Sequence, residues 1–271
     1  MDNRPIGVFD SGLGGLTAVR ALRRLLPDEN IIYFGDTGRM PYGGRPRSQI
    51  MTIARQNIGF AESFGVKAIL AACGTVSSNA PALLEGSRTK AVGVLVPGVK
   101  MLAATGAKRL GVIATKTSIE SGAFQSGIHE LAPDAEVTAL ACPEFVPLIE
   151  SGHYDSADPM VAEVVARSLE KIKSAGVGAL LLGCTHYGLI ADAIGEYLGE
   201  GVELIGAADA SAYSLAGYLR DNGILASGTG SEEYYTSGST EAFNALAPVM
   251  LGYELKSRVR YIEPFPLEGI E

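Results

Sequence analysis

Short apolar runs alternate with stretches of helix-spaced apolar residues along almost the whole chain. The run Ile6–Phe9 has the length of a buried strand, and apolar residues between Leu16 and Leu26 then recur at helical spacing until Pro27. A longer helix is predicted from Ile50 to Phe64. Further strands are predicted at residues 31–34, 68–72, 92–96, 110–114, 136–140, 179–182 and 202–205. Apolar strands that alternate with helices are typical of parallel sheets covered on both faces, so the sequence predicts an α/β fold.

An internal repeat divides this pattern into two halves. Residues 65–73 align with residues 176–184 at an offset of 111, with five of nine positions identical, and both segments end in cysteine. A second pair, residues 6–11 and 110–115, aligns at an offset of 104. Any two buried strands share apolar residues, but two matches in the same order favour a true repeat. We therefore predict two similar lobes related by pseudo-twofold symmetry, each a mostly parallel sheet flanked by helices, with the active site in the cleft between them.

Composition and charge narrow the class of protein. The chain has 271 residues, 47% hydrophobic and 19% charged, which is typical of a well-packed soluble protein with room for two lobes. The formal net charge of −8 is spread without a basic cluster, which argues against nucleic acid or an anionic membrane as the main partner. The apolar runs are too short to span a bilayer, the polar start does not resemble a signal peptide, and three cysteines do not make a disulfide framework. We expect a cytoplasmic protein.

Two of the three cysteines end the repeated strands. Cys73 precedes Gly74–Asn79, and Cys184 precedes Thr185–Tyr187, so small hydroxyl residues and helix-start N–H groups follow each thiol. Such N–H groups can hold a carboxylate and lower the pKa of a thiol. A lone cysteine in an apolar strand is usually a core residue, but the repetition favours a function for both. Cys142 has no counterpart in the repeat and is predicted to be structural.

A pair of opposed thiols suits the inversion of an α-carbon. Inversion removes the α-proton on one face of the carbon and delivers a proton on the other face. One base on each lobe meets this geometry, and each must act as acid in one direction and as base in the other. A group whose pKa lies near the working pH does this best, and a thiol needs a smaller shift than a carboxyl group or an amine.

At these residues the chain resembles a known family. The supporting segments are residues 7–17, 33–43, 142–150 and 183–187. They resemble the glutamate racemases of the cofactor-independent aspartate/glutamate racemase superfamily, over roughly residues 5 to 255. The resemblance implies interconversion of L- and D-glutamate for peptidoglycan and cell shape, without a cofactor, and it allows a homodimer. It also implies a discontinuous first lobe (1–97 plus 208–260), a second lobe (98–207) and an irregular tail (261–271).

The same resemblance suggests roles for individual residues. Cys73 and Cys184 match the catalytic thiols; Asp10 is expected near Cys73, and His186 and Glu150 near Cys184. A carboxylate can anchor an ammonium group or influence a thiol proton, and a histidine can stabilise a thiolate. As an alternative, Asp10 only caps a helix. The expected substrate-binding residues are Asp10, Ser11, Pro41, Tyr42, Gly43, Gly74, Thr75, Thr185 and His186.

The sequence departs from the family pattern at three places. Gly74 stands where asparagine is common, Gly188 where proline is common, and residues 206–208 where Asp-Ser/Pro-Ala is common. The first change removes a carboxamide that contacts substrate. Hydroxyl and N–H groups remain nearby, so we expect an asparagine restored at position 74 to change the KM for glutamate by at most about tenfold.

Other functions remain as alternatives. An aspartate or hydantoin racemase would share the scaffold and the chemistry, and a catalytically silent two-lobed binding protein would share only the fold. A thiol hydrolase needs one activated cysteine, which the duplicated thiol argues against. The segment Gly12–Gly15 fits neither common nucleotide-binding glycine pattern. The sequence has no Cys/His spacing typical of a zinc site and no lysine that stands out for Schiff-base chemistry, so no cofactor or metal is expected.

Overall fold

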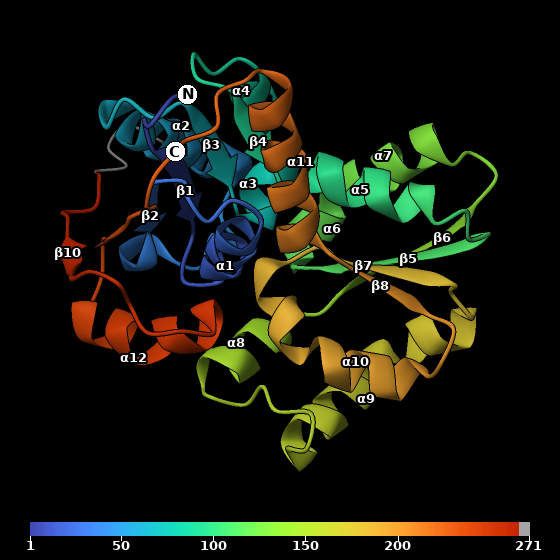
Figure 1. The fold of residues 1–271 in the computed structure, drawn as a ribbon. Coiled ribbons are helices and arrows are strands. Elements are labelled where there is room, and N and C mark those ends of the chain that lie inside the picture. The colour runs from blue at the N-terminus through green and yellow to red at the C-terminus, as the bar shows by residue number, and fades with distance from the viewer. Residues whose placement is uncertain (266–271) are drawn as a thin grey trace.

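The computed structural model describes residues 1–265, which form two separate parallel sheets flanked by helices (Figure 1). In spatial order, the first sheet contains β10 (Val259–Tyr261), β9 (Glu232–Thr236), β2 (Ile31–Gly35), β1 (Ile6–Asp10), β3 (Ala68–Ala71) and β4 (Ala91–Gly93). The second contains β6 (Glu136–Ala141), β5 (Arg109–Ala114), β7 (Ala179–Leu182) and β8 (Glu203–Gly206). The predicted α/β class with two parallel sheets is confirmed.

The two sheets share one strand order. In the first, β2, β1, β3 and β4 lie side by side; in the second, β6, β5, β7 and β8 take the same places. The register agrees, because Ile6 pairs with Ile31 and Ala68, while Leu110 pairs with Val137 and Ala179. The segments that repeat in the sequence therefore occupy equivalent strands, with β3 and β7 each beside the first strand of its set.

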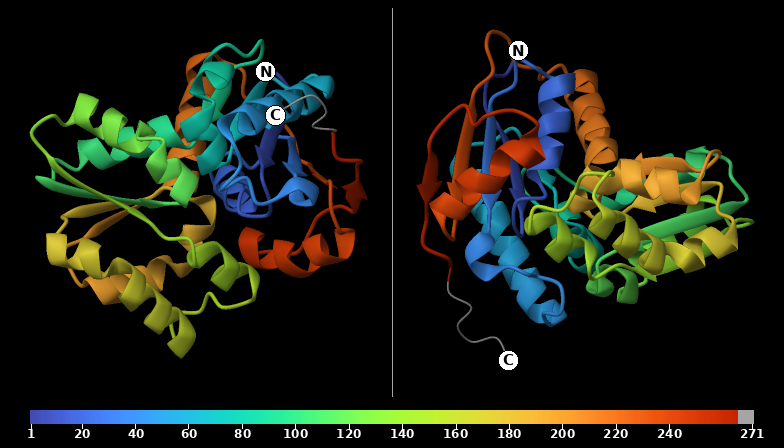
Figure 2. Two further views of the ribbon diagram at one scale, coloured as in Figure 1. Left: turned by 180° about the vertical axis from the view of Figure 1, so that it is seen from behind. Right: turned by 90° about the horizontal axis from the view of Figure 1, so that it is seen from below.

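Helices cover both faces of each sheet (Figures 1 and 2). Around the first sheet lie α1 (Leu16–Leu25), η1 (Thr37–Arg39), α2 (Arg47–Ser63), α3 (Gly74–Asn79), α4 (Pro81–Glu85) and α12 (Thr240–Leu251). Around the second lie α5 (Leu95–Ala104), α6 (Lys116–Glu120), α7 (Ala123–Leu131), α8 (Phe145–Glu150), α9 (Pro159–Ala175), η2 (Thr185–Ile190) and α10 (Ala191–Leu198). The buried apolar residues of α2 pack on one face of the first sheet, and those of α5 and α7 pack on one face of the second.

The chain passes between the two sheets twice. It leaves the first after β4 through α5, and it returns after β8 through α11 (Ala207–Asp221), which packs against both α1 and α5 (Figure 1). Strands β9 and β10 then extend the first sheet beside β2. This path agrees with the expected return to the first lobe after residue 207. The domain boundaries at 97, 207 and 260 stay a prediction.

Local sequence explains how the longest helices begin and end. Asp158 accepts a hydrogen bond from the Met160 amide at 2.9 Å and caps α9, which opens with proline and stops where Gly176 adopts a φ of +60°. Ser239 caps α12 in the same way, because its hydroxyl accepts from the Ala242 amide at 3.1 Å.

Two boundary predictions are corrected, and two strands are added. The predicted strand 92–96 ends at Gly93, because Val94 already has helical backbone angles and Pro97 fits the first turn of α5. Strands β9 and β10 were not predicted. The first opens with glutamates, and the buried Glu232 pairs with Arg23 at 2.6 Å. Tyr261, expected in the irregular tail, ends β10; residues 262–265 follow without helix or strand, and 266–271 lie outside the described residues.

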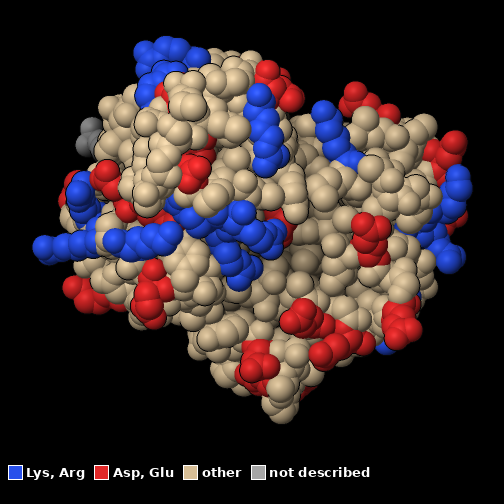
Figure 3. Space-filling model, viewed as in Figure 1, with Lys and Arg blue, Asp and Glu red and all other residues tan. Residues whose placement is uncertain are grey.

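The surface carries charges of both signs. Figure 3 shows Lys and Arg side chains gathered over the region of α1, with acidic side chains spread toward the second sheet. Arg24 at the end of α1 pairs with Asp209 at 2.8 Å, so part of this positive charge is neutralised. Within residues 1–265, we find no helix long and apolar enough to cross a membrane.

Candidate active site

The two repeated cysteines lie at equivalent positions, directly after β3 and β7. Cys73 precedes α3 and Cys184 precedes η2, and both have extended backbone angles. The carboxyl ends of parallel strands are the usual place for ligands in α/β proteins. Both thiols are buried, with 3% of Cys73 and 8% of Cys184 exposed.

The two thiol-bearing loops touch each other. A Cβ atom added at Gly74, the residue after Cys73, would lie 2.5 Å from the carbonyl oxygen of Gly183, the residue before Cys184. Gly14 is equally close to the other loop, since its Cβ would lie 2.2 Å from Nδ1 of His186. A side chain at position 74 would therefore meet backbone in this arrangement. The expectation that asparagine there changes the KM by at most about tenfold stays a prediction.

A small cavity lies beside one of the two thiols. Cys184 and Thr185 line a cavity of about 160 Å³ together with Thr17, and the lining of this cavity does not include Cys73. The Thr17 hydroxyl also donates to the carbonyl of Thr185 at 3.1 Å, which ties α1 to the loop after β7.

Asp10 and Ser11 lie beside Cys73, as expected. Asp10 is 2% exposed; its Oδ2 accepts from the Gly15 amide at 2.8 Å, and the carboxyl group lies close enough to Cys73 for the two groups to influence each other's pKa. Burial raises the pKa of Asp10. Burial, followed by the Asp10 charge, also raises the pKa of the Cys73 thiol. The expected lowering of the Cys73 pKa is thus wrong here, because desolvation outweighs the N–H groups that follow the thiol.

Cys184 has a different set of neighbours. His186 Nδ1 lies 3.8 Å from the Cys184 sulfur, and His186 Nε2 lies 3.0 Å from Oε1 of Glu150 at the end of α8. Burial by itself lowers the pKa of His186, but the hydrogen bonds to Cys184 and Glu150 outweigh it and raise the pKa to about 10. The imidazole can therefore carry a proton between a thiol and a carboxylate.

The other expected substrate-binding residues differ in how deeply they are buried. Thr185 directly follows Cys184 and Thr75 is the second residue after Cys73; both are buried, and Thr75 Oγ1 lies 3.3 Å from Thr115 Oγ1 of the second lobe. Tyr42 is buried, Gly43 is half-buried and Pro41 is exposed. Sequence reasoning missed Thr117, whose hydroxyl accepts from the Gly44 amide at 2.7 Å and joins the loop after Tyr42 to the second lobe.

The third cysteine lies in the same hydrophobic core cluster as Cys184. Cys142 is 1% exposed, and burial raises the pKa of its thiol to about 12, as expected of a core residue. Among the residues that the structure describes, we find no group of three or more His, Cys, Asp or Glu side chains able to hold a metal ion.

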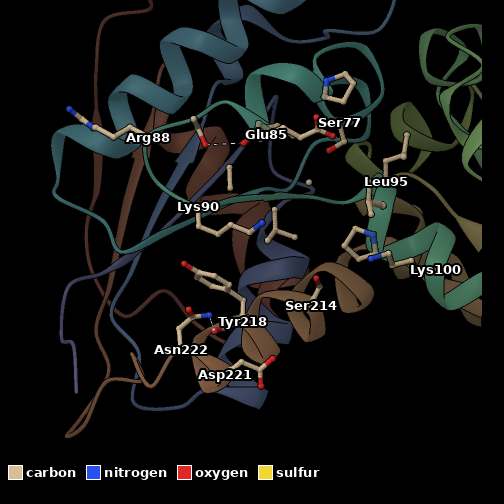
Figure 4. Close-up of a pocket in the computed structure, with 18 residues that line it drawn as sticks. Ser77, Glu85, Arg88, Lys90, Leu95, Lys100, Ser214, Tyr218, Asp221 and Asn222 are labelled. Atoms are coloured by element: carbon tan, nitrogen blue, oxygen red, sulfur yellow. Dashed lines mark hydrogen bonds between the residues drawn. The ribbon is translucent and has the colours of Figure 1, made fainter.

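A larger cavity lies away from this site. It has a volume of about 770 Å³ and lies among α4, β4, α5 and α11 (Figure 4). Arg88, Lys90 and Lys100 line it, and Lys90 Nζ lies 5.7 Å from the ring centre of Tyr218. Its lining includes neither thiol, and sequence reasoning did not find it.

Comparison with known proteins decides the family. The sequence profile of Asp/Glu/Hydantoin racemase matches residues 18–215, which is more than half of the chain. The chain belongs to the Asp/Glu/Hydantoin racemase family. It is thus an isomerase, and the resemblance seen in the motifs is confirmed.

Relatives of this racemase are similar over nearly their whole length. A glutamate racemase of Thermus thermophilus is 45% identical over 268 residues, which cover 98% of each chain. That of Exiguobacterium sibiricum is 40% identical, over 94% of this chain and 95% of its own. The crystal structure of glutamate racemase from Francisella tularensis in complex with D-glutamate matches with a TM-score of 0.90 and 34% identity, covering 97% and 99% of the two chains. An aspartate racemase from Picrophilus torridus, 17% identical with a TM-score of 0.58, shares the fold alone.

Proposed function

We propose that this racemase interconverts L- and D-glutamate, with Cys73 and Cys184 as acid/base thiols on opposite faces of the α-carbon. One observation carries the proposal: Gly74 lies against Gly183, so the loops that bear the two thiols meet between the lobes. Each thiol also has its own polar neighbours, Asp10 on one side and the His186–Glu150 pair on the other.

The proton transfer balances without a cofactor. One thiol, as thiolate, takes the α-proton and becomes neutral, while the opposite thiol gives its proton to the other face and becomes a thiolate. The next turnover in the same direction requires both thiols to return to their first state through exchange with solvent or neighbouring groups. His186 is placed to exchange a proton with Cys184, and Asp10 is placed to do so with Cys73.

Glutamate is favoured over other substrates of the family by similarity of sequence. The relatives that are 40–45% identical over nearly the whole chain are glutamate racemases, and the Francisella structure contains D-glutamate. Within the site, we propose that Asp10 faces the substrate ammonium group. Hydroxyl and N–H groups would hold the two carboxylates, contributed by Ser11, Tyr42, Gly43, Gly74, Thr75, Thr185 and His186. Pro41 has no N–H group and would only line the site.

The proposed product suggests the cellular role. D-glutamate is a building block of peptidoglycan, so we propose that the enzyme supplies it in the cytoplasm for cell-wall synthesis. Its partner is then a small molecule, not nucleic acid or a membrane. A homodimer stays a prediction, and sedimentation equilibrium of the purified protein would test it.

Proton NMR in D₂O tests the proposed function. The α-proton signal of L-glutamate should disappear as D-glutamate forms, because the proton delivered to the opposite face comes from a thiol that has exchanged with solvent. L-aspartate in a parallel sample should lose its α-proton far more slowly. Binding of glutamate without α-proton loss would indicate a silent binding protein, and faster exchange of aspartate would indicate an aspartate racemase.

A further inference from the structure

A buried polar cluster lies behind the loop that carries Tyr42. We call it the Asp36 cluster; its members are Asp36, Arg39, Tyr42, Asn57 and Ser237, and none is more than 6% exposed. They come from the loop after β2, from α2 and from the segment after β9. The motif around Asp36 contributes to the family resemblance, but sequence reasoning predicted no role for this residue.

Asp36 is the centre of the cluster. Its Oδ2 accepts from Arg39 Nε at 2.7 Å and from the Tyr42 hydroxyl, and its Oδ1 accepts from the Ser237 hydroxyl at 2.6 Å. The Tyr42 oxygen also accepts from Asn57 Nδ2 at 2.9 Å. The phenol is therefore engaged as donor and as acceptor. Any contact between Tyr42 and a substrate carboxylate falls to its backbone, whose position the anchored ring sets.

The anchored loop lies between the two halves of the candidate site. The Asp36 amide donates to the carbonyl of Asp10 at 3.0 Å, which places the start of the loop beside the Cys73 group. Within the loop, the Arg45 amide donates to the Tyr42 carbonyl at 3.1 Å. At its far side the Gly44 amide donates to Thr117 of the second lobe at 2.7 Å. A shift of Tyr42 would therefore move N–H groups that are placed to meet substrate when the lobes close.

We propose that Asp36 is a positioning residue that fixes the substrate-binding backbone of Tyr42 and Gly43 through the Tyr42 hydroxyl. The Arg39 guanidinium forms an ion pair with the Asp36 carboxylate at 2.7 Å, and a carboxylate acceptor holds the phenol more strongly than a neutral acceptor does. Ser237 extends the anchor to the chain segment that returns to the first sheet. The identity of the substrate in this inference rests on the proposed function.

The test compares Tyr42→Phe with a matched control, Tyr234→Phe. The Tyr234 hydroxyl also donates to a buried carboxylate, that of Glu232, which is paired with Arg23 and lies outside the candidate site. Both variants thus lose the same kind of bond. Tyr42→Phe should raise the KM for glutamate about tenfold and change kcat by less than about threefold, since it loosens binding and leaves both thiols in place. Tyr234→Phe should leave both kinetic constants unchanged.

A second readout does not depend on turnover. Hydrogen–deuterium exchange of the amides at 42–45 should be faster in Tyr42→Phe and in Asp36→Asn than in wild type, and unchanged in Tyr234→Phe. Unchanged exchange in Tyr42→Phe, or an equal rise of KM in Tyr234→Phe, would overturn the inference. If the wild-type enzyme does not racemise glutamate, the proposed function is refuted instead. The comparison of hydrogen–deuterium exchange between the variants then still decides the role of Asp36.

Discussion

A methyl group at position 74 tests whether the two thiol-bearing loops must touch for catalysis. In Gly74→Ala the new Cβ would lie 2.5 Å from the Gly183 carbonyl oxygen, whereas ordinary contact begins near 3.4 Å, so the loops must separate by about 0.9 Å. The carbonyl cannot swing aside as a side chain could, because the Gly183 amide donates to the Ile113 carbonyl at 2.7 Å and holds this backbone to β5.

The expected cost follows from the geometry of proton transfer. A displacement of about 1 Å in the reacting groups can lower a rate by about 100-fold. We therefore expect Gly74→Ala to reduce kcat about 100-fold, with a smaller change in KM, since most polar groups around the substrate would remain. The free energy of unfolding should change little, because the lobes can relieve the clash by opening. Gly74→Asn should lower kcat at least as far, although asparagine is common there in the family.

Racemisation rates followed by circular dichroism, in both directions, provide the assay. The control is Gly59→Ala on α2, where an added Cβ meets nothing within 4 Å. It should leave kcat unchanged and raise the free energy of unfolding by up to about 1 kcal/mol, since alanine is the better helix former. If Gly74→Ala keeps kcat within about threefold of wild type, the loops do not need the contact seen here, and the reasoning fails.

Three further predictions concern the chemistry. Cys73→Ser and Cys184→Ser should each lower kcat by several orders of magnitude in steady-state assays, because a hydroxyl is a poor base at neutral pH. The control Cys142→Ser should stay near wild type. Near-normal racemisation by Cys73→Ser or Cys184→Ser would contradict a two-thiol mechanism. The pKa of His186 is raised from 6.5 to about 10, so its stabilising contribution is complete below pH 6.5 and is lost as the pH rises through 10. Urea unfolding should show wild type losing its advantage over His186→Gln between these values, and a constant difference would refute this. Activity should survive dialysis against EDTA; activity restored only by added metal would show that a metal takes part.

The sequence predicted most of the fold because parallel strands are apolar on both faces. Strands β1 to β8 each carry a run of apolar residues, and the alternation of these strands with helices leaves few possible fold topologies. Strand β9 was not predicted because its burial depends on a partner residue far away in the chain. The buried Glu232 pairs with Arg23, which lies 209 positions away in the sequence, and no local pattern reports such a pair.

The candidate site was predictable to the extent that the repeat marks it. Cys73 and Cys184 stand out because each ends a repeated strand, whereas the Asp36 cluster needs the pairing of β9 beside β2 to bring Ser237 to Asp36. The direction of the Cys73 pKa was mispredicted for a related reason. N–H groups at a helix start can be read from sequence, but the desolvation that outweighs them depends on how closely the lobes meet.

The repeat makes the two thiols equivalent in the backbone, and their neighbours make them unequal in charge. His186 can donate a hydrogen bond to the Cys184 sulfur, whereas the Asp10 carboxylate can only accept one from Cys73. Burial and the Asp10 charge therefore favour a proton on Cys73. The ammonium group of an amino acid would add positive charge next to Asp10. The substrate would then complete the Cys73 half of the site, whereas the protein already supplies the Cys184 half through His186 and Glu150.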